Sequence, residues 1–175
     1  TYAVTKMLGE SGFMNYSKVF GFECTIVRYH NVYGPRMGFK HVIPQVVKRM
    51  LENENPFSVY GFDQTRAFNY IDDAVRGTIS AMDKQEANSE IIHIGDMEAE
   101  ITIEQLIHYI GELTDYRGKY ERQGIHDGSV SRRCPDTTKA KELLDYQPET
   151  HWKDGIKKTV EWYMDYYKQG KEIFE

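Results

Sequence analysis

Apolar residues recur along this chain with two different spacings, one typical of helices and one of buried strands. Helical spacing, together with capping residues, predicts helices at residues 2–20, 41–51, 74–82, 102–113, 136–144 and 152–168. Short runs rich in apolar and β-branched residues predict strands at residues 23–29, 56–60, 67–71, 91–95 and 119–122. Helices separate most of these strands, so the pattern favours an α/β protein with parallel strands.

Local polar signals mark where several of these elements begin and end. Gly21 is the expected C-terminal cap of the first helix, and residues 102–105 form a capping box at the start of the fourth. Acidic residues 72–73 are expected to cap the third helix, because carboxylates accept hydrogen bonds from free amides. Residues 31–35 and 124–135 are expected to be loops.

Composition narrows the class of protein. The 175 residues are 40% hydrophobic and 13% aromatic, enough to bury a sizeable core. The 22 basic and 27 acidic residues give a net charge of −5, so neither nucleic acid nor a membrane surface is an expected partner. Two cysteines make no disulfide framework, and the chain shows no signal peptide or membrane-length apolar run. A reducing cytoplasm is the expected location.

Two common cofactor motifs and a metal site are absent from the sequence. No two of the 14 glycines stand two apart, which rules out the Gly-x-Gly-x-x-Gly dinucleotide loop, and there is no Walker A loop. No two histidines are three to five residues apart and none lies near a cysteine, so no metal is expected; the histidines are His30, His41, His93, His108, His126 and His151.

Tyr2 and Lys6 form the first candidate for chemistry. Residues four apart share one face of a helix, and a nearby ammonium favours the phenolate, which makes a tyrosine usable as a base. The same spacing recurs at Tyr167 and Lys171. Two unrelated residues on one helix face therefore remain the alternative for the first pair.

Five sequence blocks occur in an order that points to one family. The first, Arg28-Tyr29-His30-Asn31-Val32-Tyr33-Gly34-Pro35-Arg36, follows a predicted parallel strand, where ligands bind in open α/β sheets. The others are residues 56–61, 64–73, 92–95 and 132–140. Together with the first helix, they resemble the extended short-chain dehydrogenase/reductase family, specifically its nucleotide-sugar epimerases, dehydratases and decarboxylases.

The resemblance implies roles for the first helix and the loop that follows it. Tyr2 would exchange a proton with a sugar hydroxyl while hydride passes to or from NAD, and Lys6 would hold the nicotinamide ribose and acidify the phenol. The backbone of His30 would approach the nicotinamide amide, and Asn31 would bind substrate near its diphosphate. A turn residue that bonds its own backbone is the alternative for Asn31.

The resemblance also implies a substrate pocket. Arg66 and Arg133 match arginines that grip the diphosphate, a task suited to a planar, always-charged group, with Arg132 a close second to Arg133. Val59 and Tyr60 match the segment that packs on the nucleobase and ribose. Solvated surface for the arginines and a core strand for residues 59–60 are the alternatives.

The fold implied by the resemblance is the C-terminal part of a Rossmann-like, doubly wound parallel sheet plus a small α/β substrate-binding domain. Residues 1–35 and 63–100 would belong to the NAD-binding part, and residues 36–62 and 101–175 to the nucleotide-sugar part. The family's N-terminal half, with its glycine loop, has no counterpart here. Because the chain also begins without a methionine, it is expected to be a fragment that is inactive alone.

The activity implied is that of an NAD-dependent nucleotide-sugar epimerase similar to UDP-glucose 4-epimerase, in a cytoplasmic homodimer. A UDP-glucuronate decarboxylase and a nucleotide-sugar 4,6-dehydratase are alternatives, because their distinguishing groups would lie upstream of Tyr2. A non-catalytic sugar-nucleotide-binding module is a further alternative. Finding a strand and Gly-x-x-Gly-x-x-Gly encoded upstream would separate enzyme from module.

Overall fold

A computed structural model describes residues 2–125 and 128–170 of the chain. Its helices are α1 (Tyr2–Phe20), α2 (Val42–Leu51), α3 (Ile71–Asp83), the 3-10 turn η1 (Gln85–Ala87), α4 (Ile103–Leu113), α5 (Thr138–Leu144) and α6 (Trp152–Lys168). Its strands are β1 (Ile26–Tyr29), β2 (Val32–Tyr33), β3 (Phe57–Tyr60), β4 (Thr65–Ala67), β5 (Asn69–Tyr70), β6 (Ile91–Ile94), β7 (Glu100–Thr102), β8 (Tyr120–Gln123) and β9 (Arg132–Arg133). The predicted α/β class is confirmed.

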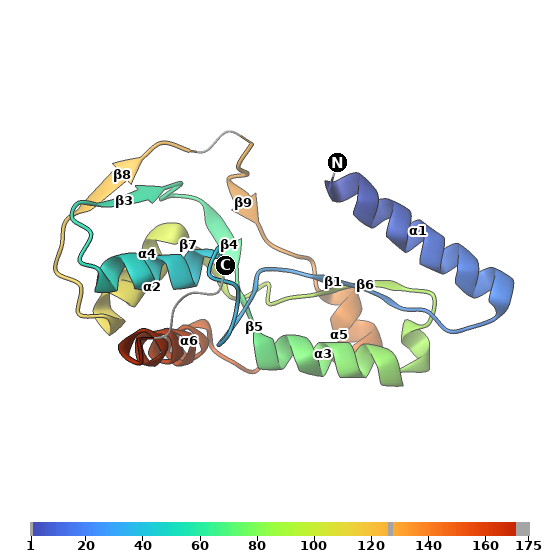
Figure 1. The fold of residues 1–175 in the computed structure, drawn as a ribbon. Coiled ribbons are helices and arrows are strands. Elements are labelled where there is room, and N and C mark those ends of the chain that lie inside the picture. Colours follow the sequence, from blue (N-terminus) through green and yellow to red (C-terminus); the bar gives the residue numbers. More distant parts are fainter. Residues whose placement is uncertain (1, 126–127, 171–175) are drawn as a thin grey trace.

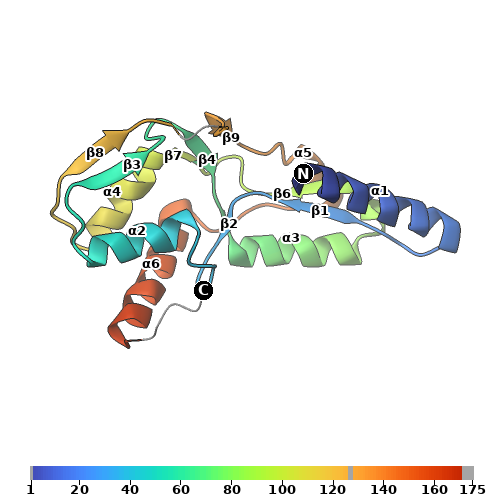
Figure 2. The same cartoon turned by 45° about the horizontal axis from the view of Figure 1, so that its top comes forward.

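Most strand pairs are parallel and join segments far apart in the sequence. β1 pairs with β6, β2 with β5, and β3 with β8, all in parallel. β4 lies between β7, which is antiparallel to it, and β9, which is parallel. In both views α1 and α3 lie on opposite sides of the β1–β6 pair (Figures 1 and 2). Helices on two sides of a parallel pair are the arrangement expected of a doubly wound sheet.

Two apolar clusters form the core. The larger, here the α6 cluster, includes Ile43, Val47, Phe57, Leu106, Ile110, Ile156, Val160 and Tyr163. The smaller, here the β6 cluster, consists of Ala74, Ala81, Ala87, Ile92, Ile94, Ala140, Leu144 and Tyr146. Figure 1 shows their elements at two ends of the molecule. Helix α5, expected with the substrate-binding part, packs instead in the β6 cluster with the strands of the first part.

Several predicted boundaries are confirmed. Gly21 follows α1 with a φ of +73°, and its amide donates to the Ser17 carbonyl at 2.8 Å. The Thr102 hydroxyl accepts from the Gln105 amide while the Gln105 side chain accepts from the Thr102 amide, which is the capping box expected there. These ends are set by neighbours in sequence, so the sequence predicts them well.

Two expected loops contain short strands. Residues 31–35 include β2, whose Val32 and Tyr33 pair with Asn69 and Tyr70 of β5. The stretch 124–135 includes β9, which pairs with β4. The predicted strand 67–71 is divided between β4, β5 and the start of α3. Strands of two residues carry no periodicity of their own and exist because a distant partner supplies the hydrogen bonds.

The acidic start of α3 does not cap the helix as expected. Tyr70 occupies the N-cap position, with no side-chain cap hydrogen bond. Asp73 is instead fully buried, where it pairs with Arg76 and accepts from the backbone amides of Glu149 at 3.0 Å and Thr150 at 3.2 Å. A buried carboxylate needs such partners. Its role is to hold the chain leading into α6 against α3.

Helix α1 packs little against the rest of the chain. Ser17 is its only buried residue within the described range, and Tyr16 stacks on Phe20 within the helix itself. Glu10 holds the helix to β1 through both carboxylate oxygens, which accept from Arg28 at 2.5 and 2.8 Å. The amphipathic stripe expected here is not seen, because exposed apolar residues lie on all sides. No helix of the described chain is long and apolar enough to span a membrane.

Candidate active site

Tyr2 and Lys6 lie together in the first turns of α1. The Lys6 ammonium is 5.5 Å from the centre of the Tyr2 ring. Tyr2 is 75% exposed, so its hydroxyl faces solvent in this chain rather than a pocket. The structure thus brings the two predicted residues side by side on one accessible face, close enough for the ammonium to act on the phenol.

His30 and Asn31 follow β1 at its carboxyl end. The His30 amide continues the β1–β6 pairing by donating to the Ile94 carbonyl at 3.1 Å. Asn31 has a φ of +41°, and its side-chain amide donates to the Ala67 carbonyl at 2.8 Å. Its own carbonyl accepts from Asn69 at 3.2 Å. Asn31 therefore serves the local backbone through its amide nitrogen, the contact expected of a turn residue.

Arg66 and Arg133 are neighbours on paired strands, at matched positions of β4 and β9. Arg66 donates to the Gln64 side-chain oxygen at 3.0 Å and to the Thr65 carbonyl at 2.7 Å. Burial and the charge of Arg133 lower the pKa of Arg66. Neither arginine has a carboxylate partner in the part of the chain that the structure describes. Two adjacent cations without an internal counter-ion are suited to an external anion.

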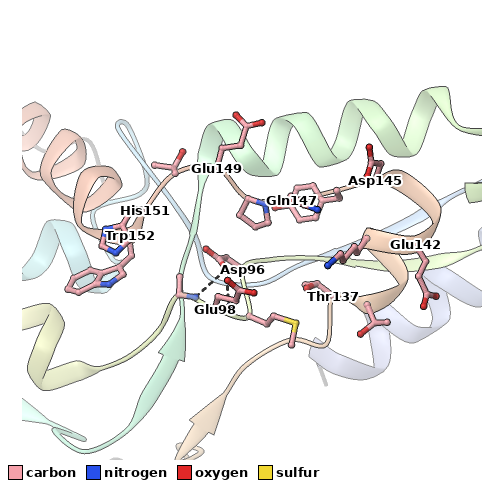
Figure 3. A pocket seen from close by; sticks show the side chains of 16 residues that line it. Asp96, Glu98, Thr137, Glu142, Asp145, Gln147, Glu149, His151 and Trp152 are labelled. Atoms are coloured by element: carbon pink, nitrogen blue, oxygen red, sulfur yellow. Dashed lines mark hydrogen bonds between the residues drawn. The ribbon is translucent and has the colours of Figure 1, made fainter.

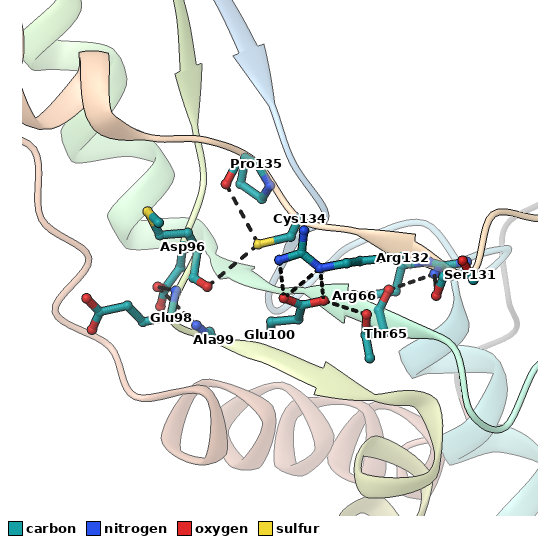
Figure 4. A network of polar contacts seen from close by, with 11 residues as sticks. Thr65, Arg66, Asp96, Glu98, Ala99, Glu100, Ser131, Arg132, Cys134 and Pro135 are labelled. Carbon is teal, nitrogen blue, oxygen red and sulfur yellow. Dashed lines mark hydrogen bonds and ion pairs between the residues drawn. The ribbon is translucent and has the colours of Figure 1, made fainter.

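Arg132 has a different environment although it adjoins Arg133. Its guanidinium donates to both oxygens of Glu100, the shortest contact being 2.7 Å (Figure 4). Glu100 also accepts from the Thr65 hydroxyl at 2.5 Å. The hydrogen bonds from Arg132 and Thr65 hold the pKa of Glu100 below its usual value. Arg132 is thus neutralised within the chain, which distinguishes it from Arg133.

Val59 and Tyr60 end strand β3 and differ in exposure. Val59 is 2% exposed within the α6 cluster, whereas Tyr60 is 49% exposed. The Val59 side chain therefore contributes to the core, and only its backbone is placed to meet a ligand.

The largest cavity lies apart from all of these residues. It has a volume of about 1110 Å³ and is formed by the loop after β6, helix α5 and the segment 145–152 (Figure 3). Five carboxylates and a single lysine, Lys141, line it. Burial raises the pKa of one of these acids, Asp96. Walls of this charge repel a diphosphate, so this cavity is not a nucleotide-sugar site.

No metal centre is found. Among residues 2–125 and 128–170, no three histidine, cysteine, aspartate or glutamate side chains are placed to hold an ion. His126 lies outside the described residues.

Comparison with known proteins gives a consistent set of relatives. A model of the family described as GDP-mannose 4,6 dehydratase matches residues 1–159. The chain is 37% identical to a UDP-N-acetyl-alpha-D-glucosaminuronate decarboxylase of Bacillus cytotoxicus, covering 94% of this chain and 53% of that protein. It is 35% identical to a UDP-glucuronate 4-epimerase of Thermodesulfobacterium geofontis, covering 92% and 49%. The chain spans about half the length of the curated relatives it matches.

Solved structures agree with the sequences. A UDP-glucuronic acid 4-epimerase from Bacillus cereus, in complex with UDP-glucuronic acid and NAD, matches with a TM-score of 0.85 at 32% identity, over 95% of this chain and 53% of that one. A UDP-glucose 4-epimerase from Thermotoga maritima with UDP-glucose matches with a TM-score of 0.86 at 30% identity, over 95% and 54%. The expected Rossmann-like fold is confirmed by these likenesses.

Proposed function

The chain belongs to the GDP-mannose 4,6-dehydratase family, within the NAD-dependent nucleotide-sugar epimerases and dehydratases of the extended short-chain dehydrogenase/reductase family, and on that premise we propose that the full-length protein is an NAD-dependent UDP-sugar 4-epimerase. The observation that carries the proposal is the Tyr2–Lys6 pair, placed one turn apart in a chain similar to two UDP-sugar 4-epimerases of known structure.

Tyr2 is proposed as the acid and base of the reaction. NAD supplies a hydride acceptor, and later donor, at the sugar carbon that carries the hydroxyl. As hydride leaves that carbon, the Tyr2 oxygen takes the hydroxyl proton, and it returns the proton when hydride is delivered to the opposite face. The Lys6 ammonium, 5.5 Å from the ring centre, favours the phenolate that starts this cycle.

The residues of this chain fit the nicotinamide end of NAD. Tyr2 and Lys6 are accessible on α1, and His30 lies at the carboxyl end of a parallel strand, where such sheets bind ligands. The sequence contains no Gly-x-Gly-x-x-Gly loop for the cofactor's phosphates. We assign Tyr2, Lys6 and His30 to the cofactor on this basis.

The substrate is assigned to the opposite strands. Arg66 and Arg133 would hold the diphosphate, because they are adjacent cations without an internal counter-ion. Arg132 is retained as a weaker candidate, since Glu100 already engages it. Asn31 would bind near the diphosphate. The backbone of Val59 and the half-exposed ring of Tyr60 would contact the base and ribose of a UDP-sugar.

The division of the chain is proposed as expected from the sequence. Residues 1–35 and 63–100 would contribute to the NAD-binding part, and residues 36–62 and 101–175 to the substrate part, with α5 packing across to the first. We also propose a cytoplasmic location, because Cys24 and Cys134 are both free thiols. A homodimer would cover the apolar residues that α1 exposes.

Replacing Tyr2 by Phe in the full-length protein tests the proposal. Turnover of UDP-glucose or UDP-glucuronate should fall by roughly 10²- to 10⁴-fold, the usual contribution of general acid–base catalysis, while substrate affinity changes little. Tyr16→Phe on the same helix is the matched control and should keep normal turnover. Near-normal turnover in Tyr2→Phe would refute the assignment.

A decarboxylase is the second candidate, favoured by the 37% identity to a UDP-sugar acid decarboxylase. The two activities separate by product. With UDP-glucuronate, an epimerase yields an isomer of equal mass, whereas a decarboxylase yields carbon dioxide and a UDP-pentose. Mass spectrometry of the product therefore chooses between them.

A further inference from the structure

Two histidines form a directly bonded pair at the carboxyl end of β1. The Nε2 atom of His30 lies 2.7 Å from the Nδ1 atom of His93, and the two rings stack with centres 4.8 Å apart. His93 lies in β6, whose pairing with β1 brings it beside residues 28–30. A bond this short requires one nitrogen to donate and the other to accept.

Arg28 determines which nitrogen donates. Its Nη1 atom lies 3.5 Å from Nε2 of His93, and both Glu10 oxygens hold its guanidinium in place. A guanidinium can only donate, so the His93 Nε2 atom that faces it must present a lone pair. Neutral His93 therefore carries its proton on Nδ1.

The direction of the bond passes from His93 to His30. Because His93 carries its proton on Nδ1, it donates to Nε2 of His30, and neutral His30 in turn carries its proton on its own Nδ1. That atom makes no hydrogen bond with any residue in the described ranges. The chain Arg28, His93, His30 thus ends in a donor with no partner from the protein.

Both rings are favoured in the neutral form that this argument needs. Burial is the main cause that lowers the pKa of His30, and the charges of His93, Arg133 and Arg28 add to it. Burial also lowers the pKa of His93, which faces a mixed set of charges. Those that lower it are Arg28 and Lys139, and those that oppose are Asp136 and Glu10.

We propose that Arg28 and His93 are positioning residues that hold His30 as its Nδ1–H tautomer, so that this N–H donates to an acceptor oxygen of the bound dinucleotide. The identity of the ligand rests on the proposed function. The place of His30 after β1 puts its donor at the ligand-binding edge of the strands. There an oxygen such as that of the nicotinamide carboxamide is the complementary group.

Nitrogen NMR of the full-length protein tests the tautomer directly. In protein carrying ¹⁵N-histidine, the ring spectrum near neutral pH should show the proton on Nδ1 of both His30 and His93, against the Nε2–H form usual for histidine in water. In His93→Phe, which keeps a stacked ring without nitrogens, the His30 proton should move to Nε2. His108→Phe, on α4, is the matched control and should leave the His30 signals unchanged. A proton on Nε2 of His30 in the parent protein overturns the inference.

Calorimetry with NAD tests the ligand. His93→Phe should bind NAD roughly 3- to 10-fold more weakly, the range that corresponds to one neutral hydrogen bond, and His108→Phe should bind it normally. Equal affinity in His93→Phe, with its tautomer changed, refutes donation to the dinucleotide. If the parent protein binds no NAD, the proposed function fails, while the nitrogen spectrum still decides whether Arg28 and His93 set the tautomer.

Discussion

Adjacent residues of one type can have opposite surroundings, as Arg132 and Arg133 show. The sequence could not choose between them, because a strand directs successive side chains to opposite faces and the faces are defined by partner strands. β7 brings Glu100 to Arg132, and β4 brings Arg66 to Arg133. The sequence did predict Tyr2 and Lys6 side by side, since helical spacing alone makes them neighbours.

This difference predicts how arginine substitutions affect substrate affinity. Replacing Arg66 or Arg133 by Ala in the full-length protein should weaken UDP binding by roughly 1.5 to 3 kcal/mol, the scale of a hydrogen bond to a charged group. Arg132→Ala should leave it nearly unchanged, because that guanidinium is engaged by Glu100. Calorimetry with UDP measures all three. The ranking would be wrong if Arg132→Ala caused the largest loss.

At the scale of elements, the sequence predicted those that neighbours in the chain define. Helices α2, α4 and α6 start and end within a residue or two of their expected limits, because periodicity and caps are local signals. The short strands β2, β5, β7 and β9 could not be predicted in this way, because each depends on hydrogen bonds to a distant segment. The loop at residues 31–35 therefore became part of a paired layer.

Close packing between α6 and β2 gives a prediction at this scale. Ala normally stabilises a helix over Gly by about 1 kcal/mol. At Gly155 in α6, however, an added methyl would overlap the Tyr33 hydroxyl and lie 2.9 Å from Cδ2 of Tyr70. Overpacking costs about 1–3 kcal/mol, so Gly155→Ala should lower the free energy of unfolding.

Gly12→Ala is the matched control for that substitution, because Gly12 is also helical and an added methyl meets no atom within 4 Å in this chain. It should be neutral or stabilising. Urea unfolding of both variants gives the comparison, and a more stable Gly155→Ala would contradict the packing argument.

For the whole molecule, the most distinctive surface is that of α1. Met7 is 64% exposed, Phe13 63% and Phe20 67%, and these residues do not share one stripe of the helix. A helix with apolar residues on all sides is normally covered on more than one side. The sequence predicted the helix but not this exposure, because exposure depends on what packs against the element.

A homodimer through α1 can be tested with one charge. Phe13→Glu in the full-length protein would place two unpaired carboxylates in a symmetric interface, which is strongly unfavourable. Light scattering at micromolar concentration should then report a monomer where the parent protein is a dimer. Lys18→Glu, at a polar position of the same helix, is the control and should stay dimeric. A monomeric parent, or a dimeric Phe13→Glu, would argue against this interface.

The parallel pairs also determine how the chain can fold as it is synthesised. Arg28 of β1 meets His93 of β6 across 65 residues, and Ser58 of β3 meets Glu121 of β8 across 63. The two spans overlap, and α5, which follows both, completes the β6 cluster. Neither end of the molecule can therefore close while the ribosome is still making the middle. Non-local pairing of this kind slows folding and leaves strand edges open, so the nascent chain depends on protection from aggregation until nearly all of it has emerged.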